Sequence, residues 1–328
     1  MDIFRKDDRF STTRLLSKPK IEIQKYKKQE DKFQTVLFLP DDRGVKYEGG
    51  LRTKGYFKYS YEKKNSAWYI YDNNSIGKEI DIEYYEFDKL PLITVITVVF
   101  NSEKYIEQTI LSVLNQTYDN VEYIIIDGGS TDGTIGIIKK YEHAIDYWVS
   151  EKDEGIYDAM NKGISISNGK WINLLNSGDT LNGYNVFKNI GLYFDNIDIF
   201  YSDTVFLIRH QKKIWKSDIK KRLFIHQSII YLKSLHDKYG KYLNIPNVTI
   251  SDYLFFSNIF IQARLKKIND PISIYRVDGI SSNTKHFYQK LAVDLMCGYN
   301  TPFKVGLTIL IYPFYKTVKK FFIFLFKR

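Results

Sequence analysis

The chain has 328 residues, of which 44% are hydrophobic, so it is long enough for one large domain with appendages or for two modest domains. Its single cysteine, Cys297, excludes an internal disulfide and agrees with a reducing compartment such as the cytosol. The formal charge is +10, but eight basic residues and one acidic residue fall within 285–328, so the basic excess is a local feature of the C-terminal part.

Residues 1–90 are predicted to form an N-terminal extension with partial β structure and no assigned function. The opening residues, MDIFRKDDRFSTT, have no apolar run behind their charges, which argues against a secretory signal. A Lys-rich stretch precedes a Tyr-rich one, in which the alternating segments FKYSY and AWYIYD indicate short strands or hairpins.

Strands and helices alternate from Pro91 onward. The apolar, β-branched run LITVITVVF is typical of a buried parallel strand. Strands are predicted at 92–100, 121–127, 145–150 and 171–175, and helices at 103–116, 135–143 and 155–163. This alternation of strands and helices predicts an α/β fold, in which a mainly parallel central sheet is flanked by helices and the crossovers are right-handed.

The pattern becomes mixed after Asp179. Helices are predicted at 185–194, 234–240 and 251–267, and strands at 197–208, 222–232 and 270–282. The second of these helices would end at Gly240, which is a common helix C-terminus. The third would begin with a capping Ser251 or Asp252.

Polar side chains follow nearly every strand between Pro91 and Asp179. They are Asn101, Asp127, Glu151, Asp153 and Asp179. Ligands of open α/β sheets bind outside the carboxyl ends of the strands, and a cluster of carboxylates there suits a divalent metal and a nucleotide diphosphate. Local structure offers an alternative, because DGGS and NSGD are also ordinary turn sequences and helix caps.

Several common site motifs are absent. The sequence contains no G-x-x-x-x-G-K-[ST], no G-x-G-x-x-G and no G-x-S-x-G, which excludes a P-loop, a dinucleotide fingerprint and a hydrolase elbow. The histidines show no metal-ligand spacing, so a zinc site is not predicted.

The order of the motifs resembles that of family 2 glycosyltransferases. VITVVFN, SVLNQTY, IIIDGGSTDGT, SEKDEGIYDAMNKGI and GKWINLLNSGD follow one another between about 91 and 179, and weaker similarity continues to about 282. Through its GIYDAMNKG segment, the chain most resembles the branch of this family that builds bacterial polysaccharides. The resemblance implies a GT-A fold and an inverting transfer of a sugar from a nucleotide-diphospho-sugar to a glycan or polyprenyl-linked acceptor, in the assembly of O-antigen, capsule or exopolysaccharide.

The resemblance also implies a donor site. The residues carried over by motif as nucleotide-sugar-binding are Thr97, Val99, Asn101, Asp127, Asp153, Asn161, Asn176 and Gly178. Asp127 would contact the base, while Asp153 and Asn161 would lie along the sugar-phosphate side. Asp179 matches the last acid of the family's D-x-D-type motif and would hold a divalent metal, Mn²⁺ or Mg²⁺. This sequence departs from that motif, since Asn176 and Gly178 replace the carboxylates often found there.

Three further residues are implied on the acceptor side. Asp252 stands where the family has its catalytic base, which would deprotonate the acceptor hydroxyl. His226 and Gln227 match a recurring His-Gln pair near the acceptor or the diphosphate. The segment YLFF follows Asp252, where a second acid often stands.

The predicted catalytic domain spans 91–284, and 285–328 form a basic amphipathic tail. The longest uncharged run, 305–315, is too short to cross a bilayer as a helix. Aromatic and aliphatic residues beside lysines favour the interface of an anionic membrane, with the protein cytoplasmic and peripheral on the inner face of the cell membrane. The alternative is a helix packed on the domain.

Two other functions compete with the transferase. A nucleotidyltransferase would normally have a Gly-rich loop with Lys or Arg after its first strand, whereas this strand is followed by Asn101-Ser102-Glu103. A nucleic-acid-binding protein is suggested by charge alone and ranks last, because the basic residues lie in an apolar tail, so no nucleic-acid partner is predicted.

Overall fold

The computed structural model describes residues 2–18, 37–39, 47–72, 75–80, 88–191, 193–208, 210–277 and 284–312. Its strands are β1 (Asp2–Phe4), β2 (Leu16–Lys18), β3 (Tyr47–Gly49), β4 (Ser60–Lys64), β5 (Ala67–Asp72), β6 (Ser75–Ile80), β7 (Lys89–Leu90), β8 (Ile93–Val99), β9 (Val121–Asp127), β10 (Tyr147–Ser150), β11 (Trp171–Leu174), β12 (Thr180–Leu181), β13 (Ile199–Ser202), β14 (Thr204–Ile208), β15 (Gln211–Trp215), β16 (Ile229–Leu232), β17 (Leu265–Ile268) and β18 (Ser273–Arg276). Its helices are α1 (Ile106–Leu114), α2 (Thr134–Lys140), α3 (Ile156–Ile166), α4 (Val186–Gly191), α5 (Leu235–Tyr239), α6 (Ser251–Ile259) and α7 (Thr284–Met296), with 3-10 turns η1 (Ser11–Thr13), η2 (Arg52–Lys54) and η3 (His226–Ser228).

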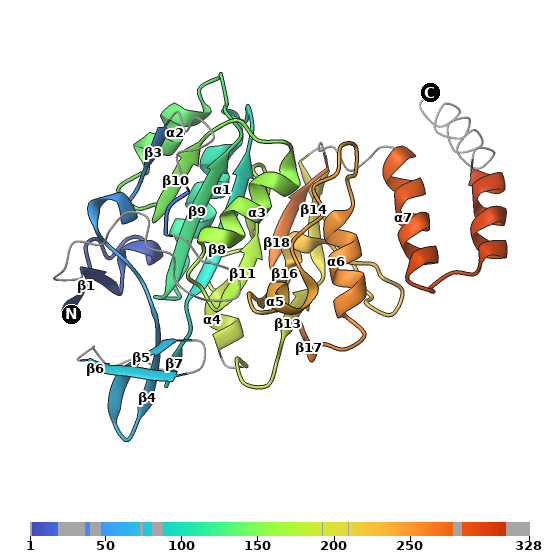
Figure 1. Ribbon diagram of the computed structural model, residues 1–328. Coiled ribbons are helices and arrows are strands. Elements are labelled where there is room, and N and C mark those ends of the chain that lie inside the picture. The colour runs from blue at the N-terminus through green and yellow to red at the C-terminus, as the bar shows by residue number, and fades with distance from the viewer. Residues whose placement is uncertain are drawn as a thin grey trace.

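An eight-stranded sheet forms the centre of the molecule, in the order β17-β13-β16-β11-β8-β9-β10-β3 (Figure 1). Strands β11, β8, β9 and β10 are mutually parallel, as the alternation of strands and helices predicts. Strand β8 is buried along its whole length, because it has a neighbouring strand on each side and helices over both faces. The carboxyl ends of these four strands therefore meet along one edge of the sheet.

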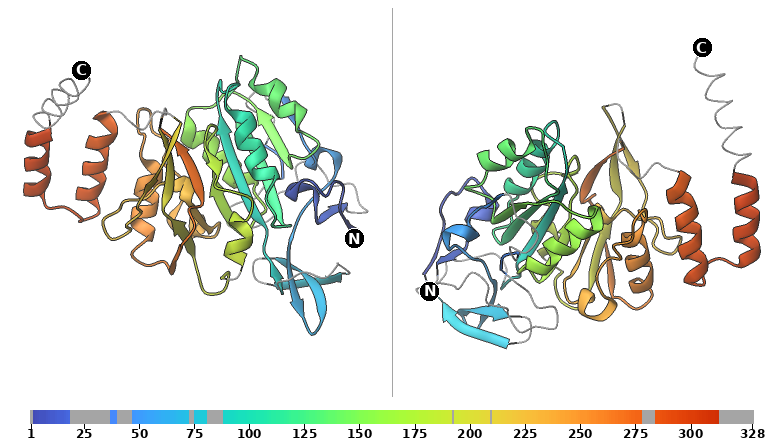
Figure 2. Two further views of the ribbon diagram at one scale, coloured as in Figure 1. Left: turned by 180° about the vertical axis from the view of Figure 1, so that it is seen from behind. Right: turned by 45° about the horizontal axis from the view of Figure 1, so that its top comes forward.

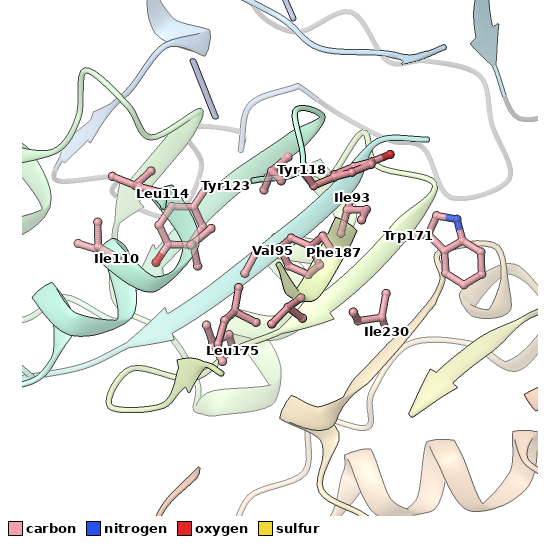
Figure 3. Close-up of a cluster of buried hydrophobic side chains, with 14 of the residues drawn as sticks. Ile93, Val95, Ile110, Leu114, Tyr118, Tyr123, Trp171, Leu175, Phe187 and Ile230 are labelled. Atoms are coloured by element: carbon pink, nitrogen blue, oxygen red, sulfur yellow. The ribbon is translucent and has the colours of Figure 1, made fainter. Parts of the chain in front are cut away.

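Each face of the sheet carries its own hydrophobic core. On one face, α1, α2 and α4 pack on the strands, and Figure 3 shows part of this cluster, including Val95, Ile110, Tyr123 and Phe187. On the other face, α3 and α6 cover the sheet through residues such as Met160. The two further views in Figure 2 show the same layered arrangement from behind and with the top tilted forward.

Gly163 lets α3 lie close to the sheet. A Cβ atom at this position would come within 2.4 Å of Cγ2 of Ile96 on β8 and within 3.4 Å of Cγ1 of Ile126 on β9. The last glycine of the GIYDAMNKG segment, Gly163, is therefore required for the close packing of α3 on the sheet.

Gly163→Ala is expected to lower the free energy of unfolding by about 1–3 kcal/mol, because the added methyl group overpacks the core. The measurement is urea denaturation followed by circular dichroism. Gly136→Ala on α2 is the matched control, since a Cβ added there would meet no neighbouring atom within 4 Å. The control is expected to be neutral or more stable by about 0.5–1 kcal/mol. A Gly163 variant as stable as the parent would contradict the packing argument.

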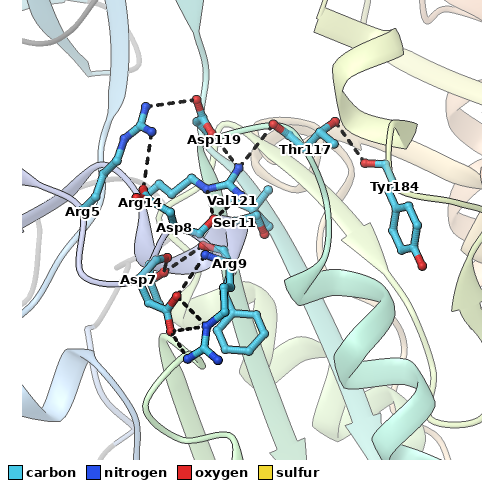
Figure 4. A network of polar contacts seen from close by, with 12 residues as sticks. Arg5, Asp7, Asp8, Arg9, Ser11, Arg14, Thr117, Asp119, Val121 and Tyr184 are labelled. Carbon is cyan, nitrogen blue, oxygen red and sulfur yellow. Dashed lines mark hydrogen bonds and ion pairs between the residues drawn. The ribbon is translucent and has the colours of Figure 1, made fainter.

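Part of the N-terminal region belongs to the central sheet. Strand β3 pairs antiparallel with β10 at the sheet edge. The segment 2–18 also contacts the main domain. The Ser11 hydroxyl donates to the Val113 carbonyl on α1. The Arg14 guanidinium donates to Asp119, in the loop before β9, at 2.8 Å (Figure 4). Strands β6-β5-β4-β7 form a separate small sheet, which lies below the central one in Figure 1.

Several predicted boundaries in the second half of the chain were wrong. The helix predicted at 251–267 ends at Ile259, and Leu265–Ile268 is instead a strand that pairs in parallel with β13. The strand predicted at 197–208 is two strands, β13 and β14, which lie in different sheets. The strand predicted at 222–232 begins only at Ile229, after the 3-10 turn η3. The predicted end of a short helix at Gly240 is confirmed.

The C-terminal part forms two helices at the end of the molecule opposite the N-terminus (Figures 1 and 2). Helix α7 packs on α6, where the Tyr253 hydroxyl donates to Asp294 at 2.6 Å. Residues 302–312 form a second helix, and its residues Phe303 and Leu310 are 79% and 77% exposed. Within the described residues no helix is both long and apolar enough to span a membrane.

Candidate active site

Asp127 ends β9 and organises the turn that follows it. Its side chain is fully buried, and its carboxylate accepts hydrogen bonds from the backbone N–H groups of Gly129 and Ser130. The hydroxyls of Ser130 and Ser150 donate to the same carboxylate, the latter at 2.6 Å. Asp127 therefore builds the strand-end turn, and any contact it makes with a nucleotide has to share these oxygens.

Asn101 and Asp153 border this turn. Asn101 adopts φ +45°, and its side-chain oxygen accepts a bond from the Thr131 backbone N–H at 2.8 Å. The Asp153 carboxylate packs against Gly128 and accepts a bond at 3.0 Å from the N–H of Gly155, the residue directly before α3. Burial raises the pKa of Asp153 above its ordinary value. Asn101, Asp127 and Asp153 thus lie around one strand-end turn.

Three of the predicted donor-site residues have side chains that contact other parts of the protein and are not available to a ligand: Thr97, Val99 and Asn161. Thr97 is fully buried inside β8 and pairs with the Tyr123 hydroxyl at 3.1 Å, while Val99 belongs to the hydrophobic core. The Asn161 amide donates to the Tyr242 carbonyl at 2.8 Å and accepts from the Tyr242 N–H at 3.0 Å. The side chain of Asn161 therefore holds the chain near α6.

The NSGD segment follows β11 and places Asp179 in a nearly closed environment. Asp179 is 4% exposed and accepts bonds from the Gln227 side chain at 2.7 Å and from the Arg276 backbone N–H at 2.8 Å. Burial raises the pKa of its carboxyl to about 7, although these donors oppose the rise. Gly178 takes φ +98°, the left-handed region that glycine favours, and so allows the turn.

Asp252 lies at the start of α6 between two polar partners. The Tyr157 hydroxyl donates to Asp252 Oδ1 at 2.6 Å, and His226 Nδ1 lies 2.6 Å from Oδ2. Nε2 of the same imidazole is 3.4 Å from the Asn176 amide nitrogen. His226 and Gln227, which are neighbours in η3, therefore connect Asp252 to the NSGD segment from Asn176 to Asp179.

The Asp252 carboxyl is held in its ionised form. Burial alone would raise its pKa, but the charge of His226 and the hydrogen bonds from His226 and Tyr157 outweigh burial, so the pKa lies below its ordinary value. A carboxylate that is ionised, 17% exposed and fixed in orientation has the properties of a general base.

The family model described as Glycosyl transferase family 2 matches residues 94–242. The matched span runs from β8 to the residues after α5 and includes the strand ends, the NSGD segment and η3. This part of the chain is therefore similar to family 2 glycosyltransferases.

Curated relatives agree with the family match. An uncharacterized glycosyltransferase of Mycobacterium tuberculosis is 40% identical over 97 residues, which are 29% of this chain and only 37% of that protein. An uncharacterized glycosyltransferase of Haemophilus influenzae is 28% identical over 240 residues, which are 69% of this chain and 94% of that protein. The chain therefore spans little more than a third of the first relative's length and most of the second's.

Solved structures confirm the predicted GT-A fold. Residues 1–349 of S. aureus TarS in complex with UDP-GlcNAc superpose with a TM-score of 0.55 at 18% sequence identity. The superposition covers 64% of this chain and 67% of that one. At this level of identity the likeness establishes the shared fold alone.

The residues of the NSGD segment offer two oxygens to a divalent cation. Asp179 supplies a carboxylate, and Asn176 Oδ1 is buried without a hydrogen-bond partner. Among the described residues, no group of three or more His, Cys, Asp or Glu side chains could hold a metal. Mg²⁺ usually takes one or two carboxylates and completes its shell with phosphate and water. The pair therefore fits a cation that binds together with a diphosphate.

Sequence reasoning missed Arg276, which lies beside this pair. Its guanidinium carbon is 4.3 Å from the centroid of the Tyr105 ring, and its Nε donates to the Gly178 carbonyl at 3.3 Å. Its Nη2 lies 3.3 Å from Gln108 Oε1. The segment SIYRVDG contains no motif that singles out the arginine, and only the pairing of β18 with β12 brings it next to Asp179.

Proposed function

We propose that the chain is an inverting glycosyltransferase, which moves a sugar from a nucleotide-diphospho-sugar to a glycan or polyprenyl-linked acceptor in bacterial surface polysaccharide assembly. The observation that carries the proposal is the ionised Asp252 carboxylate, held by Tyr157 and connected through His226 to the NSGD segment. This arrangement supports a site in which Asp252 acts as the base and the NSGD segment binds a cation. The family match covers Tyr157, His226 and the NSGD segment and supports the proposal, although it ends before Asp252.

Asp252 would take the proton of the acceptor hydroxyl as that oxygen attacks C1 of the donor sugar. The bond between C1 and the diphosphate oxygen breaks, and the nucleoside diphosphate leaves with the bonding electron pair. Attack from the face opposite the leaving group inverts the anomeric carbon. The proton passes to Asp252, whose carboxylate is kept ionised by His226 and Tyr157 before the reaction.

Asp179 and Asn176 would hold Mn²⁺ or Mg²⁺, which when bound offsets the charge that builds on the leaving diphosphate. Arg276 lies on the same side of the site and uses its Nε and Nη2 groups to fix its orientation over Tyr105. A guanidinium has five N–H donors, so others remain for phosphate oxygens. We therefore assign Arg276 to the diphosphate of the donor.

Arg276→Met is expected to weaken binding of the donor by about 10–100-fold, because a hydrogen bond to a charged group contributes about 1.5–3 kcal/mol. Calorimetric titration with UDP-, GDP- and dTDP-sugars in the presence of Mn²⁺ measures the effect. Asp179→Asn is expected to remove the dependence of binding on Mn²⁺.

Arg264→Met is the control for the loss of charge, since Arg264 is 56% exposed and pairs with Asp198 away from the site. Unchanged donor affinity in the Arg276 variant would refute its assignment. A folded protein that binds none of the nucleotide-sugars would refute the transferase itself.

The helix at 302–312 would attach the enzyme to the inner face of the cell membrane. Its apolar residues Phe303, Leu307 and Leu310 are exposed, and Lys304 lies among them. Apolar side chains beside lysine suit the interface of an anionic bilayer. Residues 313–328, which complete the predicted tail, lie outside the described residues.

Phe303→Asp/Leu310→Asp is expected to abolish co-sedimentation with vesicles of phosphatidylglycerol, because each substitution places a charge on the face that would enter the interface. The parent is expected to bind these vesicles more strongly than vesicles of phosphatidylcholine. Leu243→Asp serves as a control, since Leu243 is also exposed (47%) but lies elsewhere. Equal sedimentation of the parent and the double variant would exclude this role of the helix.

A further inference from the structure

Helix α3 begins directly beside Asp252. Tyr157, the second residue of α3, is 5% exposed, and its hydroxyl donates to Asp252 Oδ1 at 2.6 Å. His226 Nδ1 engages the other oxygen at the same distance. Each carboxylate oxygen of Asp252 thus has one side-chain partner, and the two partners come from different elements of the domain.

Tyr157 is itself held in place by α3. Its ring packs on the ring of Tyr242 at 5.9 Å between centroids. Asn161 fixes the backbone of Tyr242 with two hydrogen bonds. Because Tyr157 and Asn161 are four residues apart, they lie on the same face of the helix. The GIYDAMNKG segment therefore supplies the Tyr157 hydroxyl that contacts Asp252. It also supplies the Asn161 amide that holds Tyr242, on which the Tyr157 ring packs.

The Tyr157 hydroxyl stays protonated and can only donate to a carboxylate. Burial, followed by the neighbouring charge of Asp252, raises the pKa of the phenol well above its ordinary value. The other titratable groups that influence or adjoin Asp252 are His226 on η3, Tyr242 and His286 on α7. Among these side chains, His226 and Tyr157 contact the carboxylate directly.

We propose that Tyr157 is a positioning residue for the catalytic base: its hydroxyl fixes the rotation of the Asp252 carboxylate and stabilises the anion that accepts the acceptor's proton. The inference rests on the proposed function. The terminal torsion of an aspartate has no sharp rotamer wells, so its orientation depends on hydrogen bonds. Tyr157 supplies that constraint from the helix that borders the donor side, so α3 couples the two halves of the site.

Tyr157→Phe tests the proposal, because it removes the hydroxyl and keeps the ring that packs on Tyr242. The turnover number is expected to fall by about 10–100-fold, the effect of losing a hydrogen bond to a charged group. The acidic limb of the kcat/KM profile is expected to move to higher pH, since one of the contacts that lower the pKa of Asp252 is lost. Donor affinity is expected to stay within about twofold.

Tyr253→Phe is the matched control on the next residue of α6. The Tyr253 hydroxyl also donates to a carboxylate, Asp294, at 2.6 Å, but this bond points toward α7. A purely structural effect would appear in both variants. The control is expected to keep the turnover number and the acidic limb of the parent.

The proposal is overturned if Tyr157→Phe leaves turnover and the acidic limb unchanged, or if both variants change them alike. A parent protein without any transferase activity would refute the proposed function separately. In that case ¹³C NMR of aspartate-labelled protein still decides, because the Asp252 carboxyl resonance must titrate at higher pH in Tyr157→Phe than in the parent and in Tyr253→Phe. Coincident titration curves would overturn the contact's role.

Discussion

Asp252→Asn is expected to lower the turnover number by about 10²–10⁴-fold, which is the usual contribution of a general base. The amide has nearly the same shape and can still pair with Tyr157 and His226, but it cannot take a proton. Donor binding is expected to remain, because Asp252 does not contact the proposed diphosphate site. Steady-state kinetics with the donor identified by titration, combined with calorimetry, separates the two effects.

Asp195→Asn is the control, because Asp195 is 71% exposed and forms a surface pair with Lys89. The parent's pH profile provides a second check. Since the pKa of Asp252 is lowered, its carboxylate stays ionised as pH falls through the ordinary carboxyl range, and kcat/KM should decline only below that range. An Asp252→Asn variant with turnover within about tenfold of the parent would remove the base assignment.

Arg52→Met is expected to lower the free energy of unfolding by about 3–5 kcal/mol, because it leaves a buried carboxylate without its cation. Arg52 and Glu122 are each 2% exposed and pair at 2.6 Å. The same guanidinium donates to the carbonyls of Leu37 and Ile166 at 2.7 and 2.8 Å. This one side chain therefore ties the N-terminal region to the central sheet, and urea denaturation measures its contribution.

Two variants separate burial from simple loss of charge. Lys54→Met removes an exposed pair with Glu142 at 3.4 Å and is expected to cost less than about 1 kcal/mol. Arg52→Met combined with Glu122→Gln is expected to recover part of the loss, because no unpaired charge then remains in the core. An Arg52→Met protein within about 1 kcal/mol of the parent would show that the buried pair contributes little.

The sequence alone determined the parallel core and the order of its motifs. The apolar runs that became β8 and β9 are hydrophobic along their whole length, and this property follows from local composition. The polar residues after each strand could be placed at one sheet edge, because parallel strands have their carboxyl ends on the same side. Local pattern therefore sufficed to predict the α/β fold and the position of Asp127 and Asp179 at that edge.

Only the tertiary structure decided how the polar residues are used. The Asp127 carboxylate accepts hydrogen bonds from the turn that follows it. Asn161 bonds to the backbone of Tyr242, and Thr97 is buried in β8. The contact between Tyr157 and Asp252 joins residues 95 positions apart. No local periodicity encodes such a contact, because it depends on where α3 and α6 pack on the same face of the sheet.

The same reason explains the wrong boundaries and the missed arginine. Residues 265–268 form a strand because their backbone groups pair with those of β13. Strand β3 belongs to the sheet because it pairs with the side of β10 that does not face β9. Arg276 reaches Asp179 through the pairing of β18 with β12. Hydrophobic period and turn chemistry determine which segments can be strands and helices, whereas the choice of partner depends on burial and hydrogen bonding between segments distant in the chain.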